Sequence, residues 1–219
     1  MDMLIQTALD RVSMEDALKT GKILEETTDI LEIGTSLIKD YGLMGSVGVF
    51  RQQFPQMKIL GDIKTCDEGA YEFRKAFEAG ADIVTVMGFS SDATIQACMK
   101  VAAEMKRACM IDLLEVSADR TGRLAEMFPE AVFAIHLPSD LEGQGLARLV
   151  ERMCEKLGGN RHVAAAGGIQ LEDIPFLRDS GVEIAIIGGA ITKAEKIRET
   201  ASAFRMAARQ IRKPVKRKR

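Results

Sequence analysis

Residues 58–88 read KILGDIKTCDEGAYEFRKAFEAGADIVTVMG, and this stretch contains a complete strand–helix–strand unit. The mostly apolar run Lys58–Lys64 predicts a buried strand, and Ile83–Gly88 predicts a second one. Between them, Glu68–Ala79 has the spacing of polar and apolar residues that is typical of an amphipathic helix. Two strands joined by a helical crossover lie parallel in a sheet. This stretch therefore predicts one βαβ unit.

The same unit recurs along the chain. The expected strands are Leu4–Leu9, Ile30–Gly34, Lys58–Lys64, Ile83–Gly88, Met110–Leu114, Val132–Leu137, Val163–Gly167 and Ile184–Gly189. The expected helices are Ser13–Glu26, Ser36–Phe54, Glu68–Ala79, Asp92–Arg107, Asp119–Phe128, Gly145–Leu157, Leu171–Asp179 and Ala194–Ile211. Most of these strands are apolar throughout, as strands covered on both faces must be.

Eight such units without a Pro/Gly-rich linker predict an α/β fold, a single (β/α)₈ TIM barrel over residues 1–211. The alternative is an open doubly wound sheet. That fold would more often carry a glycine-rich fingerprint after its first strand, where this chain reads Leu9-Asp10-Arg11. Residues 212–219 are mostly basic, a composition typical of a disordered tail.

Composition excludes several classes of protein. The formal net charge is −2, so we expect no nucleic-acid partner. No window approaches the roughly 18 apolar residues that a membrane-spanning helix needs. The four cysteines (Cys66, Cys98, Cys109 and Cys154) show no CxxC spacing, and the chain opens without a secretory signal. We therefore expect reduced thiols, no zinc and a cytoplasmic protein.

Ionisable side chains gather at one end of the expected strands. At or near the C-termini of strands one, two, three, five and six stand Asp10, Glu32, Asp62, Lys64, Asp112 and His136. Strands seven and eight end in Gly167-Gly168 and Gly188-Gly189. In a closed barrel all these ends open onto one mouth, so residues far apart in sequence become neighbours.

Two interpretations of the third strand compete. Asp62 and Lys64 are two apart, so on a strand they point to the same side. They could form only a buried ion pair, with Asp67 capping the next helix. Alternatively they belong to a catalytic site. The convergence of acids, a lysine and a histidine on one rim favours the second interpretation.

The residue types indicate the chemistry. Glu32 and Asp62 supply hard oxygen ligands that suit Mg²⁺ with retained waters. Lys64 could neutralise an enolate or enediolate oxygen, and His136 could act as general acid or base. His162 lies at the opposite rim, where we expect a structural role. The glycine pairs let backbone N–H groups approach a phosphate. The residues alone thus predict a Mg²⁺-assisted enzyme acting on a small phosphorylated molecule.

At Asp62-Ile-Lys-Thr-Cys-Asp67 the chain resembles the orotidine 5′-monophosphate decarboxylase superfamily, whose signature is Asp-x-Lys-x-x-Asp at the end of strand three. Nearly the whole chain is similar to one branch, which contains 3-hexulose-6-phosphate synthase and 3-keto-L-gulonate-6-phosphate decarboxylase. The segments that carry this likeness are Ala8-Leu-Asp10, Glu32-Ile-Gly-Thr35, Asp62-Ile-Lys-Thr-Cys-Asp67, Gly80-Ala-Asp-Ile-Val-Thr85, Asp112, His136 and Ala166-Gly-Gly-Ile169.

The resemblance implies roles for the catalytic residues. Glu32 and Asp62 match Mg²⁺ ligands, and Asp62 counts among the catalytic residues. Lys64 matches the lysine that stabilises the enediolate, and His136 matches a proton-transfer histidine. Asp67 matches an aspartate that reaches into the active site of a partner subunit, which implies a homodimer.

Further residues match the substrate site of the branch. Asp10 and Asp112 are expected to bind substrate, and the two glycine pairs match the phosphate site. A synthase would condense D-ribulose 5-phosphate with formaldehyde through a 1,2-enediolate. It would therefore be a carbon–carbon lyase of the aldehyde-lyase type, with D-arabino-3-hexulose 6-phosphate as its product.

Three positions favour the synthase over the decarboxylase. Decarboxylases tend to carry Glu where this chain has Asp112, Arg where it has Ser139, and Thr where it has Ala166. Two departures keep alternatives open. Leu137-Pro138 follows the histidine of strand six, where synthases usually carry Thr-Gly. Ala190 stands where many relatives have a phosphate-binding arginine. The alternatives are the decarboxylase and a non-catalytic phosphosugar-binding protein.

Overall fold

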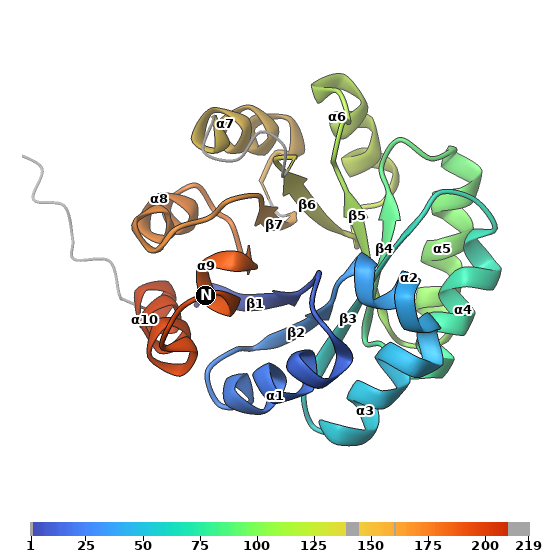
Figure 1. Cartoon of the computed structure of the whole chain (residues 1–219). Helices are drawn as coiled ribbons and strands as arrows, with labels where there is room; N and C mark the ends of the chain where they lie inside the picture. Colours follow the sequence, from blue (N-terminus) through green and yellow to red (C-terminus); the bar gives the residue numbers. More distant parts are fainter. Residues whose placement is uncertain (1, 139–144, 160, 210–219) are drawn as a thin grey trace, which may run out of the picture.

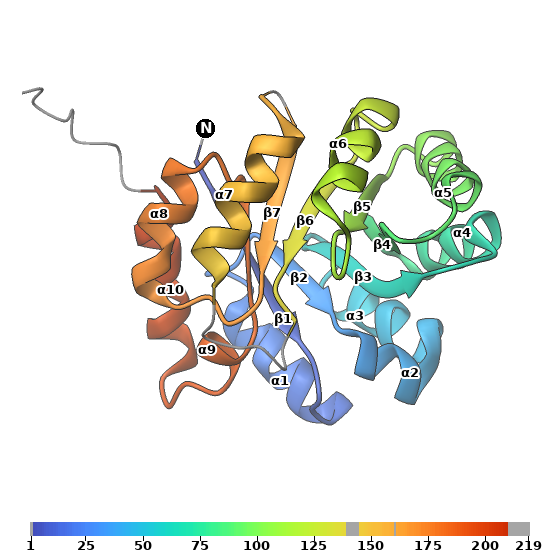
Figure 2. The same ribbon diagram turned by 90° about the horizontal axis from the view of Figure 1, so that it is seen from above.

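A computed structural model describes residues 2–138, 145–159 and 161–209 of the chain. Its eight strands form a closed parallel barrel in sequence order, with β1 paired to β8. The helices form a ring around the strands (Figure 1), and the view turned by 90° shows them along the outside of the barrel (Figure 2). The predicted α/β fold, a single (β/α)₈ barrel, is confirmed. The predicted basic tail at 212–219 lies outside the described residues.

The elements lie close to the positions that the sequence predicts. In chain order they are β1 (Leu4–Leu9), α1 (Met14–Leu24), β2 (Ile30–Ile33), α2 (Thr35–Leu43), the π-helical η1 (Met44–Gly48), α3 (Val49–Gln53), β3 (Lys58–Thr65), α4 (Gly69–Ala79), β4 (Ile83–Met87), α5 (Asp92–Glu104), β5 (Ala108–Asp112), α6 (Ala118–Met127), β6 (Val132–His136), α7 (Leu146–Leu157), β7 (His162–Ala166), the 3₁₀ turn η3 (Leu171–Asp173), α8 (Ile174–Asp179), β8 (Ile184–Ile187), α9 (Gly189–Thr192) and α10 (Ile197–Arg209).

Two local expectations were wrong, and the helix cap that belonged to the alternative interpretation of the third strand is absent. The helix expected over 36–54 is divided, because Gly42 leaves the helical region with φ 69° and ψ 170° and a π-helical segment follows it. The last strand ends at Ile187, and the glycines after it open the short helix α9, which the sequence did not predict. Asp67 does not cap α4, whose N-cap is Glu68 without a side-chain capping bond.

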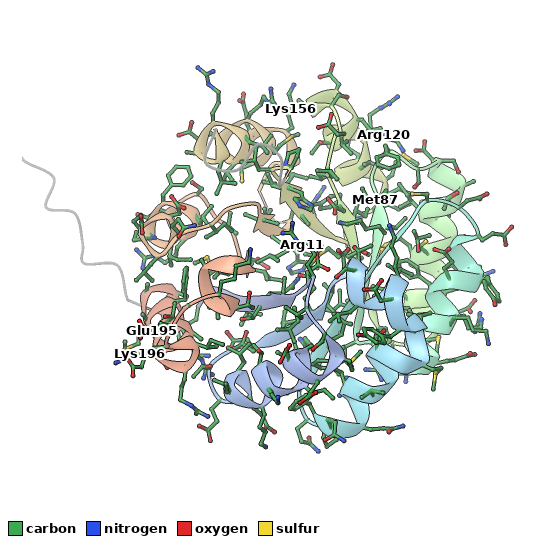
Figure 3. All side chains as sticks on the ribbon, in the orientation of Figure 1. Arg11, Met87, Arg120, Lys156, Glu195 and Lys196 are labelled. Atoms are coloured by element: carbon green, nitrogen blue, oxygen red, sulfur yellow. The ribbon has the colours of Figure 1, made fainter. Side chains whose placement is uncertain are left out.

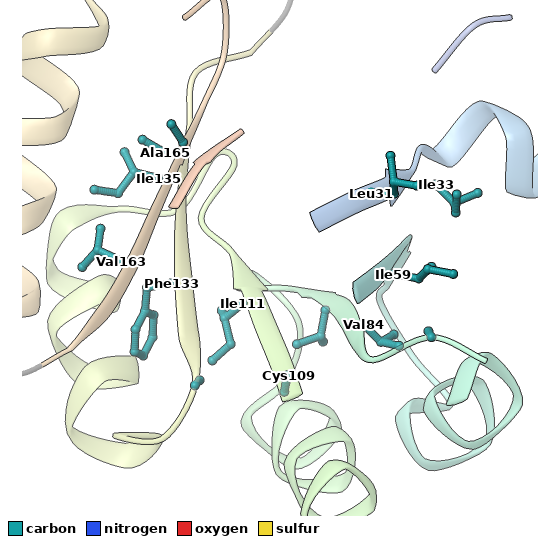
Figure 4. Packing of buried hydrophobic residues seen from close by; sticks show 14 of the residues in the cluster. Leu31, Ile33, Ile59, Val84, Cys109, Ile111, Phe133, Ile135, Val163 and Ala165 are labelled. Carbon is teal, nitrogen blue, oxygen red and sulfur yellow. The ribbon is translucent and has the colours of Figure 1, made fainter. Parts of the chain in front are cut away.

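Apolar side chains fill two regions. Outward-pointing residues at alternate positions of the strands pack against the helices, as Figure 4 shows for Ile111, Phe133 and Ile135. A second cluster fills the interior of the barrel and consists of Ile30, Leu60, Ile83, Met110, Ala134, Ala164 and Ile184. This inner cluster closes the barrel from below, so polar side chains near the C-terminal strand ends rest on an apolar floor.

Candidate active site

The barrel mouth contains a cavity of about 710 Å³. It is lined by residues from the ends of several strands and by the loops after β7 and β8. Beneath it lies a space of about 30 Å³, enough for an ordered water molecule. The residues that line this deep space are Gln6, Glu32, Leu60, Asp62, Lys64, Thr85, Met110, Asp112, Ala134, His136, Ala166 and Ile186. Ten of the eleven predicted site residues thus line one or both of these spaces, all except Asp67, and their catalytic roles stay predictions.

Lys64 stands at an irregular point of β3. The pairing of β3 with β4 shifts between Gly61 and Thr65, and Lys64 has a left-handed φ of 50°. Such a bulge redirects a side chain at a cost in backbone strain. Lys64 Nζ lies 3.3 Å from Asp62 Oδ2 and 2.8 Å from Asp112 Oδ2. The closer partner is therefore Asp112, whereas the ion pair considered from the sequence joined Lys64 to Asp62 alone.

Asp112 connects the lysine to the histidine. His136 Nδ1 lies 2.9 Å from Asp112 Oδ2, and the backbone N–H of Leu114 donates to Asp112 Oδ1 at 2.9 Å. Burial opposes ionisation of Asp112, but the hydrogen bond and charge of His136, together with the charge of Lys64, lower its pKa to about 2. Asp112 is thus an anion that holds two cationic or donor groups in place. It lines the deep space but not the larger mouth cavity.

The two predicted metal ligands are both buried in the deep space. Glu32 accepts a hydrogen bond from Gln6 Nε2 at 2.5 Å. Burial and the negative charge of Asp62 raise the pKa of Glu32 to about 8. Asp62 Oδ1 accepts from Thr85 Oγ1 at 2.9 Å, and Asp62 Oδ2 accepts from Thr35 Oγ1 at 2.8 Å. These hydroxyls fix the Asp62 carboxylate, and sequence reasoning missed both of them together with Gln6.

These residues fit a magnesium ion in the chemistry of their donors. Glu32 and Asp62 are two oxygen ligands whose mutual repulsion a divalent cation would relieve. Oε1 of the fully buried Gln6 has no hydrogen-bond partner among the described residues, and Gln6 lines the same space. Within the described ranges no group of three or more His, Cys, Asp or Glu is placed to hold a metal. Glu32 and Asp62 supply a pair of carboxylates, and such a pair suits Mg²⁺ with water or substrate oxygens completing its shell.

The other predicted residues lie around this centre. Asp10 Oδ1 accepts from the backbone N–H of Ser36 at 2.9 Å, which ties the end of β1 to the first turn of α2. Asp67 is exposed and does not line the mouth cavity of its own chain. His162 lies at the opposite end of the barrel, as predicted, and its Nδ1 lies 2.8 Å from Glu183 Oε2.

The glycine pairs line the mouth cavity, and one glycine has a structural reason of its own. Gly167 has φ 110°, and a Cβ there would lie 2.3 Å from the carbonyl oxygen of Leu137. Only glycine therefore lets the loops after β6 and β7 pack together. Leu137 and Pro138 border a separate cavity of about 450 Å³ and do not line the mouth cavity. Leu137-Pro138, the departure noted in the sequence, thus lines this separate cavity and not the mouth, and Ser139 lies outside the described residues.

Comparison with known families agrees with this arrangement. The model of the orotidine 5′-phosphate decarboxylase / HUMPS family matches residues 3–204. The chain belongs to this family. Within the family it is 37% identical over 203 residues to 3-hexulose-6-phosphate synthase from Bacillus subtilis (strain 168), covering 91% of this chain and 96% of that protein. The resemblance seen in the sequence is confirmed.

Solved structures of both activities in this family share the fold. A crystal structure of 3-hexulose-6-phosphate synthase superposes with a TM-score of 0.85 and 33% identity over 94% of this chain and 99% of that one. The 3-keto-L-gulonate-6-phosphate decarboxylase from Vibrio cholerae gives a TM-score of 0.84 and 29% identity, with 95% and 98% coverage. Because the two TM-scores are nearly equal, only individual residues can separate the two activities.

Proposed function

We propose that this chain is a 3-hexulose-6-phosphate synthase, a carbon–carbon lyase of the aldehyde-lyase type. It condenses D-ribulose 5-phosphate with formaldehyde and forms D-arabino-3-hexulose 6-phosphate. The observation that carries the proposal is the continuous chain of contacts Asp62–Lys64–Asp112–His136 at the barrel mouth. The 37% identity to the Bacillus subtilis synthase, which is far above chance over 91% of the chain, supports the same reaction.

His136 is the base in this mechanism. Asp112 is ionised and can only accept hydrogen bonds, so Nδ1 of His136 carries the proton that it donates to Asp112. Nε2 then keeps a lone pair and removes the proton from C1 of ribulose 5-phosphate. The C1–H electrons form the C1–C2 double bond of the enediolate, and the C2 carbonyl oxygen becomes negatively charged.

Lys64 stabilises that negative oxygen. The two carboxylates around it outweigh the effect of burial and raise the pKa of Lys64, so it remains an ammonium ion throughout. A fixed positive charge next to a developing oxyanion lowers the barrier to its formation. The electrons of the C1–C2 double bond then form a new bond from C1 to the carbon of formaldehyde, and the negative oxygen on C2 becomes a carbonyl again. The π electrons of formaldehyde move to its oxygen, which takes its proton from His136.

Mg²⁺ belongs to the same proposal, with Glu32 and Asp62 as its protein ligands. When bound, the ion would act as a Lewis acid that polarises substrate oxygens. Thr35 and Thr85 hold the Asp62 carboxylate in one orientation, and Gln6 does the same for Glu32. Hydrogen-bonded ligands of this kind are oriented before the cation arrives.

A homodimer in which Asp67 acts in the partner subunit is supported by the surface near that residue. Asp67 is exposed and lies outside its own mouth cavity. Tyr71, on the first turn of α4, is 63% exposed, and Phe89, after β4, is 52% exposed. The loop of Phe89 adjoins β3, because Ser90 Oγ donates to the carbonyl oxygen of Thr65 at 3.4 Å. Exposed aromatic side chains of this kind are common in interfaces.

A cytoplasmic location completes the proposal. The described cysteines are all free thiols, which suits a reducing compartment. None of the described helices is long and apolar enough to cross a bilayer.

The decisive experiment follows the C1 proton. The purified protein with Mg²⁺ and ribulose 5-phosphate in deuterated water should exchange the C1 proton, and added formaldehyde should consume ribulose 5-phosphate. Carbon dioxide release from 3-keto-L-gulonate 6-phosphate, without formaldehyde-dependent consumption, would assign the decarboxylase instead. Ligand-induced thermal stabilisation without C1 exchange would leave only a phosphosugar-binding protein.

A further inference from the structure

The loop after β8 brings a lysine to the rim of the mouth cavity. Lys193 follows α9 directly and lines the cavity together with Gly188 and Gly189. We propose that Lys193 binds the phosphate group of the substrate. This inference rests on the proposed function in one respect, namely that the substrate is phosphorylated. Lys193 would also supply the positive charge for phosphate that Ala190, at the position of an arginine in many relatives, cannot supply.

The side chain of Lys193 folds back over the glycine loop. Its backbone N–H donates to the carbonyl oxygen of Gly189 at 3.0 Å, which closes the turn. A Cβ built on Gly189 would lie 3.6 Å from Cδ, 3.7 Å from Cε and 4.0 Å from Nζ of the lysine. The aliphatic chain thus runs along the face of Gly189 that a side chain would otherwise occupy. The ammonium group is held beside the backbone that was expected to receive phosphate.

The other cations of the mouth are less suited to this role. Arg11, Lys64 and Lys193 all line the cavity. Lys64 is occupied by Asp62 and Asp112. Arg11 comes from the loop after β1, the strand that pairs with β8, and it also lacks an ion pair among the described residues. Lys193 differs from it in that its side chain lies along Gly189. Across the described residues Lys193 forms no ion pair, so its charge is available to a dianion.

The neighbouring Lys196 offers a matched control. It is exposed, lies 3.3 Å from Glu199 through Nζ, and does not line the mouth cavity. In Figure 3 Lys196 lies at the outer edge of the molecule, whereas Arg11 lies over the middle of the barrel. Lys193→Gln and Lys196→Gln therefore remove the same charge from the same segment at two different places.

The test uses inorganic phosphate as a probe and sugar substrates as a second measurement. We expect Lys193→Gln to weaken phosphate binding and to raise KM for ribulose 5-phosphate by about 10- to 100-fold, the usual worth of a charge-assisted hydrogen bond. The kcat should change far less, and Lys193→Arg should recover most of the loss. Exchange of the C1 proton of unphosphorylated ribulose should be the same in Lys193→Gln and in the wild type. Lys196→Gln should behave as the wild type.

The possible results separate this inference from the proposed function. Failure of the wild type to turn over ribulose 5-phosphate would defeat the synthase, while a phosphate affinity that depends on Lys193 would still support the lysine. Equal phosphate affinity of wild type and Lys193→Gln, or no affinity in either, would overturn the inference. So would a loss in Arg11→Gln that Lys193→Gln does not show, because it would assign the contact to Arg11.

Discussion

The ammonium nitrogen of Lys64 lies 2.8 Å from Oδ2 of Asp112, although the two residues are 48 positions apart. The same carboxylate oxygen lies 2.9 Å from Nδ1 of His136. One buried anion therefore orients both the group proposed to stabilise the enediolate and the group proposed to move the proton. The positions of Lys64 and His136 therefore both depend on Asp112, and a substitution of Asp112 should change the rate of the reaction.

Replacing Asp112 with Asn tests its role toward His136. Asn keeps the shape but removes the negative charge, and its amide can donate to Nδ1 of His136. The histidine would then hold its proton on Nε2 and could no longer act as a base. We expect kcat for C1 proton exchange to fall by about 10²- to 10⁴-fold, the usual contribution of general base catalysis. Exchange rates of the wild type and Asp112→Asn at equal Mg²⁺ concentration provide the measurement. A variant with near-wild-type exchange would remove Asp112 and His136 from proton transfer.

The hydroxyl group of Thr85 should be required for full stability and activity. It donates to Asp62 Oδ1 at 2.9 Å and accepts from the backbone N–H of the strained Lys64 at 3.0 Å. Thr85→Val keeps the volume but leaves both groups unpaired, which should destabilise the fold by about 1–3 kcal/mol and lower activity. Thr85→Ser keeps the hydroxyl and should retain most of the activity. Chemical denaturation and initial rates test this pair, and equal behaviour of the two variants would refute the role of the hydroxyl.

Glu32 should make the stability of the metal-free protein depend on pH. Its pKa is raised from 4.5 to about 8 in the folded state, so the native protein binds more protons than the unfolded chain between these values. The stabilisation is complete below pH 4.5 and is lost as the pH rises through 8. The loss should be on the order of a few kcal/mol.

Glu32→Gln removes this titration while preserving an acceptor for Gln6. In EDTA the variant should become more stable than the wild type as the pH rises, and added Mg²⁺ should stabilise the wild type more than the variant. Glu15→Gln, on the exposed face of α1, is the control and should follow the wild type. Denaturation midpoints across this pH range provide the measurement. Parallel curves for wild type and Glu32→Gln would contradict the expectation.

Asp67 can be tested by mixing two inactive variants. Lys64→Ala and Asp67→Ala should each abolish turnover while the fold persists. If Asp67 acts in the partner subunit, mixed dimers contain one site with both residues intact, because each chain supplies what the other lacks. Activity should then return after the two variants are unfolded and refolded together. If activity stays absent in mixed dimers confirmed by mass, Asp67 acts within its own chain. A fully active monomer in sedimentation would exclude the dimer altogether.

Much of this site was visible in the sequence. Strand ends can be recognised from apolar runs, and a closed barrel brings all of them to one mouth, so Glu32, Asp62 and His136 could be predicted as neighbours. Gln6 and Thr85 could not, because an interior polar residue within an apolar strand shows no periodic signal. The sequence also did not place Lys193 at the mouth. Lys193 follows the four-residue helix α9, and a helix this short that begins with glycine cannot be predicted from the sequence.

The sequence by itself determined the barrel, its element order and the ionisable groups at the strand ends, because alternating strand and helix patterns are local properties of the chain. Only the tertiary structure decided which of those groups touch. Lys64 could have been assigned to Asp62, two residues away, yet its closer contact is Asp112 from a strand two places further around the barrel. That contact depends on the bulge in β3 and on the left-handed backbone at Lys64, and such backbone geometry is set by long-range packing that no local pattern encodes.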